Sequence, residues 1–377
     1  MIALARKTMV YEWRRFAPAV FAVGFSGVLL AVQAALVLGI FGSASVYVTA
    51  SSADLWAGYP GTQSVNFGRD IGPDMEMYLR MDPDVVDVEP YLWVEGDWHG
   101  TTRTGGVPVF VSGIRTNDDA MMFSHLLPLS RRAQLREPNA VIVDRSDLEQ
   151  LGTTVGGHAW INGHRVQIVA ALSGLRALGG VNVLASQDTA RRLQAAESAA
   201  GTPYFVARLR DPALAVAAQA RLSAVPPGFG PLSVWTADAF AKRSRFYWIF
   251  DTGAGIAVLF MAAIVCLVGA VLTSQALMAV VASSAREYAM LNALGASLRA
   301  LSRVVLEQAC WIGGIGLLMG TAASALLLWV ASRYDVPVSM NWTVAIGCAV
   351  LVLGLAVISG LFAVRGLQRA EPAMLLR

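Results

Sequence analysis

Histidines and carboxylates are the residues whose types could support metal binding or catalysis in this chain. The four histidines are His99, His125, His158 and His164. Only His158 and His164 are close in sequence, on either side of an Asn162-Gly163 pair that predicts a hairpin turn. They could therefore share one face of a sheet, but a zinc site needs more ligands than two histidines supply. We interpret them as surface residues, with a metal pair as the alternative.

Motifs for nucleophilic or metal-dependent hydrolysis are missing from the sequence. Ser173, Asp144 and Asp147 have no partner at a spacing that marks a nucleophile or a carboxylate pair. Neither the Gly-x-Ser-x-Gly nor the His-Glu-x-x-His motif occurs. The sequence therefore predicts no catalytic residue, no metal site and no cofactor site in this chain.

The two lysines exclude a phosphate-binding loop of the common kind. In such a loop a lysine follows a run of glycines and reaches the nucleotide phosphates. Lys7 follows Arg6, and Lys242 follows Ala241, so neither has the glycine frame. If the protein does work, we expect its energy to come from another subunit.

The composition indicates a membrane protein with a sizeable polar part. The 377 residues are 55% hydrophobic and 15% charged, and the mean hydropathy is +0.54. The net charge of +3 gives no reason to expect a nucleic-acid partner. The cysteines, Cys266, Cys310 and Cys348, all fall in apolar runs, so we expect packing residues and no disulfide.

Four apolar stretches predict transmembrane helices, in the order one, a large insertion, then three. The first, 17–41, has no charge over about 25 residues, enough to cross ~30 Å of hydrocarbon and too long for the apolar core of a signal peptide. The others are 246–275, 308–331 and 342–364. None has an ionisable residue near its middle, where a proton- or ion-driven carrier would usually have one.

Arginine-rich segments predict the orientation in the membrane. They lie in residues 1–16, in the loop 276–307 and in the tail 365–377, and short positive segments remain in the cytoplasm. Residues 1–16 have the spacing of an amphipathic helix on the membrane surface, with a disordered basic tail as the alternative. We therefore expect a multi-pass protein of the inner (plasma) membrane with both termini in the cytoplasm.

The insertion, 42–245, is predicted to be a mixed α/β extracytoplasmic domain. Its first expected elements are a strand at 63–67, a helix at 73–80, and a strand pair at 85–94 divided by Pro90. A second unit is expected later, with a strand at 204–209, a helix at 212–223 and a strand at 232–235.

These two βα units predict a split domain. We expect 42–112 and 200–240 to pack together as a porter-like part, with 113–199 as an inserted lobe. Strands are expected in that lobe at 140–143 and 165–172.

Glycines in the third predicted span indicate close helix packing. Gly316 and Gly320 form a Gly-x-x-x-Gly step. The step could serve packing within one chain or a seam between two copies. Because four spans are too few to enclose a broad substrate path, we expect a homodimer embedded in membrane lipid.

A charged stretch between the second and third predicted spans is the most unusual part of the sequence. In it Tyr288, Leu291 and Leu294 recur at steps of three, which predicts a short amphipathic helix. Gly295 can end that helix, and a second helical piece is expected to begin at Ser297. Such a helix on the cytoplasmic face could be pushed by a cytoplasmic partner. The alternative is an ordinary amphipathic connector.

The same stretch resembles a family signature. Residues 286–296 are similar to the Arg-Glu-(aliphatic)-x-x-x-(Arg/Lys)-Ala-Leu-Gly-Ala loop of permease subunits in MacB/FtsX-like ABC transporters, and Asn292 stands where many relatives have a basic residue. Glu307 matches the acidic residue that opens the third span of that class. Residues 371–377 are similar to its Pro-x-x-x-Leu-Arg ending, and the Asp-Leu-Trp piece within 53–56 is similar to the DevC-like branch.

The resemblance implies a fold and a mechanism. The fold is four transmembrane helices with a MacB-like periplasmic core domain between the first and second. The residues expected to contact the separate ABC ATP-binding subunit are Arg286, Glu287, Tyr288, Met290, Leu291, Leu294, Gly295 and Ala296. ATP-driven closure of that subunit would draw two coupling helices together, and the first two spans would pass the movement to the outer domain. A membrane-fusion (adaptor) protein is expected on that domain, so export across the envelope is implied.

Other functions remain open at this point. An FtsX-like complex can regulate an outer partner, such as a cell-wall hydrolase, without transporting anything. A related permease can instead release lipoproteins from the membrane. A membrane-bound enzyme is a further alternative, although no convergent set of polar residues supports it.

Overall fold

The computed structural model of the chain describes residues 11–102, 105–194, 201–226, 228–283, 290, 298–334 and 336–369. The chain forms two compact units. One, the helical unit, combines Met1–Gly39 with Ile256–Arg377; the other, the sheet unit, is Ile40–Gly255. The sheet unit thus nearly coincides with the insertion predicted between the first and second spans.

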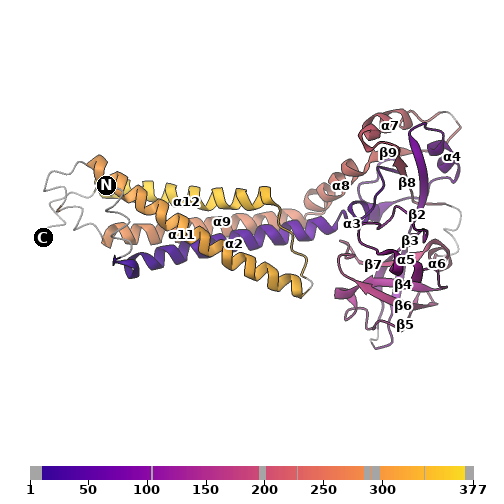
Figure 1. Cartoon of the computed structure of the whole chain (residues 1–377), viewed down its shortest axis with the longest axis horizontal. Helices are drawn as coiled ribbons and strands as arrows, with labels where there is room; N and C mark the ends of the chain where they lie inside the picture. Colours follow the sequence, from indigo (N-terminus) through magenta and orange to yellow (C-terminus); the bar gives the residue numbers. More distant parts are fainter. Residues whose placement is uncertain are drawn as a thin grey trace. The chain divides into compact units, whose positions relative to one another are not determined.

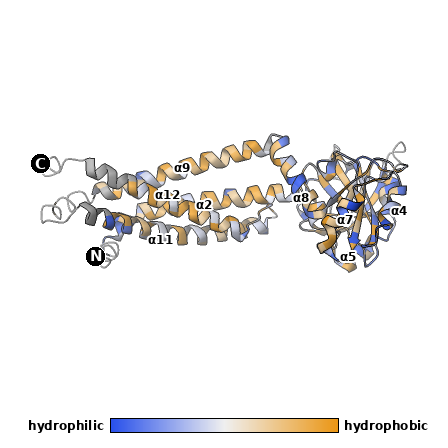
Figure 2. Cartoon of the chain, turned by 90° about the horizontal axis from the view of Figure 1, so that it is seen from above, coloured by the Kyte–Doolittle hydropathy of each residue, from blue (hydrophilic) through white to orange (hydrophobic). Residues whose placement is uncertain are grey.

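Four long helices make up the described part of the helical unit (Figure 1). They are α2 (Trp13–Ser43), α9 (Ala254–Ser283), α11 (Leu298–Arg333) and α12 (Trp342–Arg369). Each has a stretch long and apolar enough to cross a membrane, and Figure 2 shows them predominantly hydrophobic along their length. The predicted class, one apolar helix followed by three around a mixed α/β insertion, is confirmed.

The second span begins later than the sequence predicts. Residues 237–246 form α8 (Ala237–Phe246), and the next five form a π-helical turn, η5 (Tyr247–Asp251), both within the sheet unit. The apolar window starts only at Gly255. Asp251 is thus followed by a short break before α9, which keeps its carboxylate out of the apolar window.

Glycines bring α2 and α11 into close contact within one chain. A Cβ atom added at Gly316 would lie 2.8 Å from the Cβ of Val23, and one at Gly320 would lie 2.8 Å from the carbonyl oxygen of Gly24. Such contacts are closer than a side chain allows. The Gly-x-x-x-Gly step therefore serves packing inside the chain, the first of the two alternatives.

Small residues also line the contact between α11 and α12. A Cβ atom at Gly313 would lie 3.2 Å from the methyl carbon of Ala356, and one at Gly360 would lie 2.8 Å from that of Ala309. Both alanines are buried. Without a hydrophobic driving force in lipid, this close packing is what holds neighbouring spans together.

The described residues of the sheet unit form nine strands. They are β1 (Leu55–Gly58), β2 (Val85–His99), β3 (Val107–Ile114), β4 (Ala140–Asp144), β5 (His158–Ile161), β6 (His164–Leu172), β7 (Val181–Ser186), β8 (Tyr204–Leu209) and β9 (Ser233–Thr236). Their order is β3-β7-β4-β6-β5-β2-β8-β1-β9, and β3 also pairs with β2. That extra pairing closes β2, β3, β7, β4, β6 and β5 into a ring, so the lobe is a closed barrel without free edges.

Strand β2 belongs to both parts of the sheet unit. Its first half, up to Tyr91, pairs with β8, and its second half, from Leu92, pairs with β3. Pro90 pairs with Phe205 without ending the strand. The predicted strand pair is therefore one continuous strand. The lobe also begins at Leu92 rather than near 113, because β3 pairs with lobe strands on both sides.

Short helices cover the strands (Figure 1). They are α3 (Val46–Thr49), η1 (Val65–Phe67), α4 (Asp74–Arg80), α5 (Leu129–Gln134), η2 (Arg145–Asp147), α6 (Gln187–Leu193), η4 (Pro212–Leu214), α7 (Ala215–Leu222) and α8. The expected strand at 63–67 is instead η1, and the strand lies earlier, at β1. The helix at 73–80 and the later strand, helix and strand at 204–235 form at the predicted places, with boundaries within two residues.

Candidate functional site

The predicted ATPase-coupling residues lie almost entirely outside the described part of the chain. This holds for Arg286, Glu287, Tyr288, Leu291, Leu294, Gly295 and Ala296. Met290 is described: it is helical and 54% exposed. The flanking helices are described too, since α9 ends at Ser283 and α11 begins at Leu298, next to the predicted start at Ser297. The coupling role of this connection stays a prediction.

The segment that follows α2 is part of the core of the sheet unit. After two residues, α3 begins, and its Tyr47 side chain is completely buried, with Val46 and Val48 at 8% and 2% exposure. The Tyr47 ring lies 6.3 Å, centroid to centroid, from Phe123 and 6.5 Å from Tyr91. The chain leaving the first span therefore enters the sheet unit through a packed aromatic contact.

A loop from the lobe side closes over the same segment. The backbone N–H of His125 donates to the carbonyl of Ala50 at 3.1 Å, and the N–H of Ser52 donates to the carbonyl of Met121 at 3.0 Å. Met121 is itself fully buried. These bonds satisfy the polar backbone groups at the end of α3, where it enters an apolar core.

The segment that precedes the second span is buried in the same core. On α8, Phe240 is fully buried and stacks on Trp235 at 4.9 Å with an interplanar angle of 10°. Its ring also lies 5.5 Å from Trp56 of β1. The α8 helix is capped by Thr236, whose hydroxyl accepts the backbone N–H of Ala239. Helices α3 and α8 pack against each other, so both connections to the spans share one core.

The π-helical turn η5 adds a second aromatic contact. The Trp248 ring stacks on Phe67 at 6.2 Å, and Tyr247 meets the same ring edge-on at 5.2 Å. The Trp248 indole N–H donates to the hydroxyl of Ser64 at 3.3 Å. The ring also covers Gly179, at which an added Cβ atom would come within 3.1 Å of it. The sheet unit outside the barrel lobe consists of β8, β1, β9 and the first half of β2, here called the four-strand part. The Trp248 side chain of η5 thus contacts both the four-strand part and the barrel lobe.

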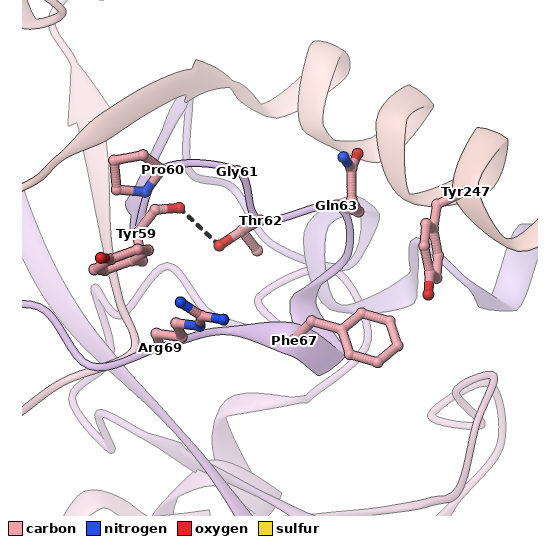
Figure 3. Close-up of a pocket in the computed structure, with 8 residues that line it drawn as sticks. All are labelled: Tyr59, Pro60, Gly61, Thr62, Gln63, Phe67, Arg69 and Tyr247. Atoms are coloured by element: carbon pink, nitrogen blue, oxygen red, sulfur yellow. Dashed lines mark hydrogen bonds between the residues drawn. The ribbon is translucent and has the colours of Figure 1, made fainter. Parts of the chain in front are cut away.

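A pocket of about 330 Å³ lies beside η5 (Figure 3). It is lined by Tyr59, Pro60, Gly61, Thr62, Gln63, Phe67, Arg69 and Tyr247. The guanidinium carbon of Arg69 lies 5.4 Å from the centre of the Tyr59 ring, and the Thr62 hydroxyl donates to the Tyr59 carbonyl at 2.7 Å. The lining residues include no carboxylate, histidine or cysteine. The pocket can bind a small anionic or aromatic group, but it offers no acid–base or nucleophilic pair.

Two buried charged side chains, Glu89 and Arg132, bind backbone groups of the 115–123 loop. The Glu89 carboxylate, fully buried, accepts the backbone N–H groups of Met121 at 2.7 Å and Arg115 at 3.2 Å. Arg132, 1% exposed, donates to the carbonyls of Arg115 and Met122. Burial raises the pKa of Glu89, and the two N–H groups and the arginines oppose that rise. Burial likewise lowers the pKa of Arg132.

The histidines do not form a metal site. In the β5–β6 hairpin His158 pairs with Gln167, and His164 pairs with Ile161. Directly paired residues share a face, and neighbouring positions alternate, so the register places His158 and His164 on opposite faces. His99 bonds Asp97 at 2.8 Å. Within the described ranges no group of three or more His, Cys, Asp or Glu residues could hold a metal ion.

Comparison with protein families identifies the segment with the last three long helices. Residues 255–372 match the family of FtsX-like permease C-terminal domains, a segment that contains α9, α11, α12 and the predicted coupling connection. This segment is an FtsX-like permease C-terminal domain. Proteins with this domain are membrane components of ABC transporters, a family that implies partnership with an ABC ATP-binding subunit, and the four apolar helices indicate a multi-pass membrane protein.

The sheet unit has solved structural neighbours. One is the periplasmic region of MacB from Actinobacillus actinomycetemcomitans, at 10% identity and a TM-score of 0.34, covering 52% of this chain and 94% of that one. Another is the extracellular domain of the noncanonic ABC-type transporter YknZ from Gram-positive bacteria, at 11% identity and a TM-score of 0.33, covering 49% and 100%. Comparison with curated protein sequences gives no significant match. Membership of the DevC-like branch stays a prediction.

The sequence analysis did not identify α3 and η5 as the segments that connect the first and second spans to the core of the sheet unit. A signal was present in both cases. Val46-Tyr47-Val48 is an apolar, β-branched and aromatic triplet beyond the end of the first predicted span. Phe246-Tyr247-Trp248 is a run of three aromatic residues before Asp251. Both are more typical of a packed core or an interface than of a loop.

Proposed function

We propose that this permease is a mechanotransmission subunit that couples ATP hydrolysis on a separate subunit to movement of the sheet unit, for export across the cell envelope. The observation that supports it is the shared burial of α3 and α8: the two segments continuous with the first and second spans pack in one aromatic core. The coupling connection, 286–296, would receive the movement, with both termini in the cytoplasm of an inner-membrane homodimer.

The buried contacts of α3 and α8 explain how movement of the spans can reach the sheet unit without being lost in a flexible linker. Withdrawing Tyr47 or Phe240 from the core would expose a full aromatic side chain, at a cost of roughly 1.5–3 kcal/mol each. Cores are close-packed and resist continuous deformation. A displacement of either span is therefore expected to move the four-strand part of the sheet unit as a body.

Transport on this mechanism needs no substrate path through the spans. The outer partner would be a membrane-fusion (adaptor) protein that contacts the sheet unit and is moved by it. ATP and magnesium would bind only to the ATPase. The same mechanics could serve a regulator of a cell-wall hydrolase or a lipoprotein-release permease, and the identity of the outer partner distinguishes these from an exporter.

The test is a pull-down of the detergent-solubilised chain with partners identified by mass spectrometry. Leu294→Asp should lose the ABC ATP-binding subunit and its stimulated ATP hydrolysis by at least tenfold, because the new charge interrupts the apolar stripe. Ser297→Asp is the matched control: it adds the same charge outside the 286–296 stretch, and it should retain the partner.

Two results would count against the proposal. Unchanged ATPase binding and stimulation in Leu294→Asp would remove the coupling role of 286–296. Absence of any ATP-binding subunit from wild-type preparations in several detergents would remove the energy coupling altogether. A co-purifying hydrolase in place of a fusion protein would favour regulation over export.

A further inference from the structure

The helical unit contains an apolar cavity of about 380 Å³ between three of its helices. From α2 it is lined by Gly27 and Ala31, and from α12 by a row that starts at Trp342 and ends at Val352. The α11 wall runs from Leu317 to Leu328. This cavity is separate from the pocket at η5 and from the coupling connection, and the inference drawn from it does not depend on the proposed function.

The cavity has the depth of one leaflet. Trp342 and Val352 are ten positions apart on α12, which is about 15 Å along a helix. The eleven positions from Leu317 to Leu328 give about 16 Å on α11. Half of a ~30 Å hydrocarbon layer is also about 15 Å. Trp342, 85% exposed, marks the end at which tryptophans of membrane proteins meet the headgroups.

Small residues create this cavity, which lies beside the contact between α2 and α11. Helices α2 and α11 touch where Gly24 meets Gly320, as described above. On α2 the lining begins at Gly27, about one turn beyond this contact; on α11 it begins at Leu317, about one turn before it, and continues past it to Leu328. A Cβ atom added at Gly27 would find no neighbour closer than 3.8 Å, at Val352. The helices therefore leave a slot along their length that side chains of this chain do not fill.

A buried hydroxyl lies on the wall of this slot. Ser324 is 5% exposed, and its hydroxyl has no hydrogen-bond partner within the described part of the chain. Other hydroxyls of α11 bond carbonyls of their own helix, as Thr321 does to Leu318 at 2.9 Å. An unpaired hydroxyl is costly where no water can reach it. The Ser324 side chain lines the cavity but its oxygen is covered, so a rotation about the Cα–Cβ bond is needed for the hydroxyl to become a donor inside it.

We propose that this cavity binds one acyl chain of a membrane phospholipid, with the hydroxyl of Ser324 donating to the ester carbonyl of that chain. The apolar lining disfavours water. The cavity runs along the helix axes for about the depth of one leaflet. A side chain from a second copy would enter it from the side and would fill only part of that length. Ser324 also lies on the half of the α11 wall that is nearer to Leu328, the end at which Trp342 lies, where an ester group is expected.

The bound chain would separate α2 from the α11–α12 pair. Beyond the contact at Gly24, the acyl chain would supply the packing that side chains do not. A lipid in this position would move or leave whenever α2 tilts against its neighbours. The spacing of these helices would therefore depend on the acyl chains of the surrounding bilayer.

The test uses the full-length chain in nanodiscs of phosphatidylglycerol and phosphatidylcholine, with a fraction of the lipid bearing a diazirine on one acyl chain. After photolysis, peptide mass spectrometry locates the adducts. We expect adducts at cavity residues such as Ala349 and Cys348, measured relative to adducts at Val350, which is 64% exposed and serves as a reference for general contact with lipid. Ala325→Phe fills the cavity and should reduce the relative cavity adduct at least fivefold.

Ala322→Phe is the matched control, since Ala322 is exposed on the same helix but does not line the cavity. It should leave the cavity adduct unchanged. Ser324→Ala should reduce the adduct about threefold or more, because it removes the hydrogen bond and little volume. If Ala325→Phe fails to give a monodisperse protein, Ala349→Leu fills the same space from α12.

Three results would overturn the proposal. The first is a cavity adduct no stronger than in the filled variant. The second is equal labelling in Ser324→Ala and wild type. The third is loss of the dimer in Ala325→Phe with no lipid adduct in wild type, which would assign the slot to a second copy of the chain.

Discussion

At the scale of single residues, Asp147 is a carboxylate in a poor environment for charge. Its side chain is 2% exposed, its nearest cation is the Arg176 Nε at 3.6 Å, and its Oδ2 atom has no partner in the described part of the chain. Burial raises its pKa to about 6; Arg176 opposes the rise and Asp144 adds to it. Near neutral pH the folded sheet unit therefore contains an ionised group that it stabilises poorly.

The pH dependence follows from the direction of that shift. Because the pKa in the folded state lies above the unfolded value of about 3.9, the stability contribution of Asp147 is greatest below pH ~4. It falls as the pH rises to about 6 and is constant above. Asp147→Asn should thus stabilise the lobe by about 1–3 kcal/mol at pH 7.5 and by much less at pH 4.5.

Hydrogen exchange of the β4 and η2 amides in the full chain, corrected for the intrinsic pH effect, measures this change. Glu149→Gln, at an exposed position of the same loop, is the control and should change protection little at either pH. Equal or lower protection in Asp147→Asn at pH 7.5 would contradict the assignment.

Arg132 is the second residue with a sharp expected effect. It is buried beside Glu89 and donates to two backbone carbonyls, whereas the preceding Arg131 is exposed and bonds Gln134. Arg132→Met should destabilise the sheet unit by about 3–5 kcal/mol, because two carbonyls inside the sheet unit would lose their donors and Glu89 would lose one of its nearby positive charges. Arg131→Met should cost less than about 0.5 kcal/mol. Thermal unfolding of the two variants compares them directly, and similar melting temperatures would refute a role for the buried Arg132 side chain.

At the scale of elements, the seating of η5 on the sheet unit is the feature most open to test. Gly179 and Gly156 both have a left-handed backbone, with φ of +99° and +86°. Only at Gly179 would a methyl group meet Trp248; at Gly156 nothing lies within 4 Å. Alanine at either position costs about 1–2 kcal/mol in backbone strain, and at Gly179 it should also displace the Trp248 ring.

The comparison of Gly179→Ala with Gly156→Ala therefore isolates the contact from the strain. We expect faster hydrogen exchange in η5 and the end of α8 for Gly179→Ala alone. In the assembled complex we also expect weaker transmission, measured as a distance change in the sheet unit on adding ATP. Identical exchange of η5 in the two variants would show that the Trp248 contact does not hold this turn in place.

At the scale of the whole molecule, the least covered span suggests where two copies meet. Within the described residues, 11% of the α9 window is buried inside the chain, against 17–33% for the other three windows. Helix α9 therefore gains most from contact with a second copy, and it also leads directly to the coupling connection. The expected homodimer, still a prediction, would bring the two connections together through α9.

Cysteine cross-linking tests this seam. In a background with Cys266, Cys310 and Cys348 replaced by alanine, Leu267→Cys on α9 should form a disulfide between copies in membranes. Val350→Cys on α12 is the control, because both side chains are 64% exposed. Cross-linking of Val350→Cys at the same yield, or of neither variant, would argue against an α9 seam.

Features that depend on local composition could be predicted from the sequence. The four spans follow from runs of apolar residues, because a ~30 Å apolar layer requires about 20 such residues in a row. The coupling role of residues 286–296, inferred from their charges between two such runs and from their similarity to a family signature, stays a prediction, and the family match spans them. Helix and strand positions in the 204–235 part followed from period and turn residues.

Features that depend on contacts between distant segments were decided only by the tertiary structure. Strand β2 is shared by barrel and sheet because residues 85–91 and 92–98 find different partners, β8 and β3, and no local pattern marks that change. Register placed His158 and His164 on opposite faces. The choice between packing inside the chain and a dimer seam at Gly316 depended on Val23, almost three hundred residues earlier. Local sequence sets periodicity, but partner and register are set by what each surface can bury elsewhere in the chain.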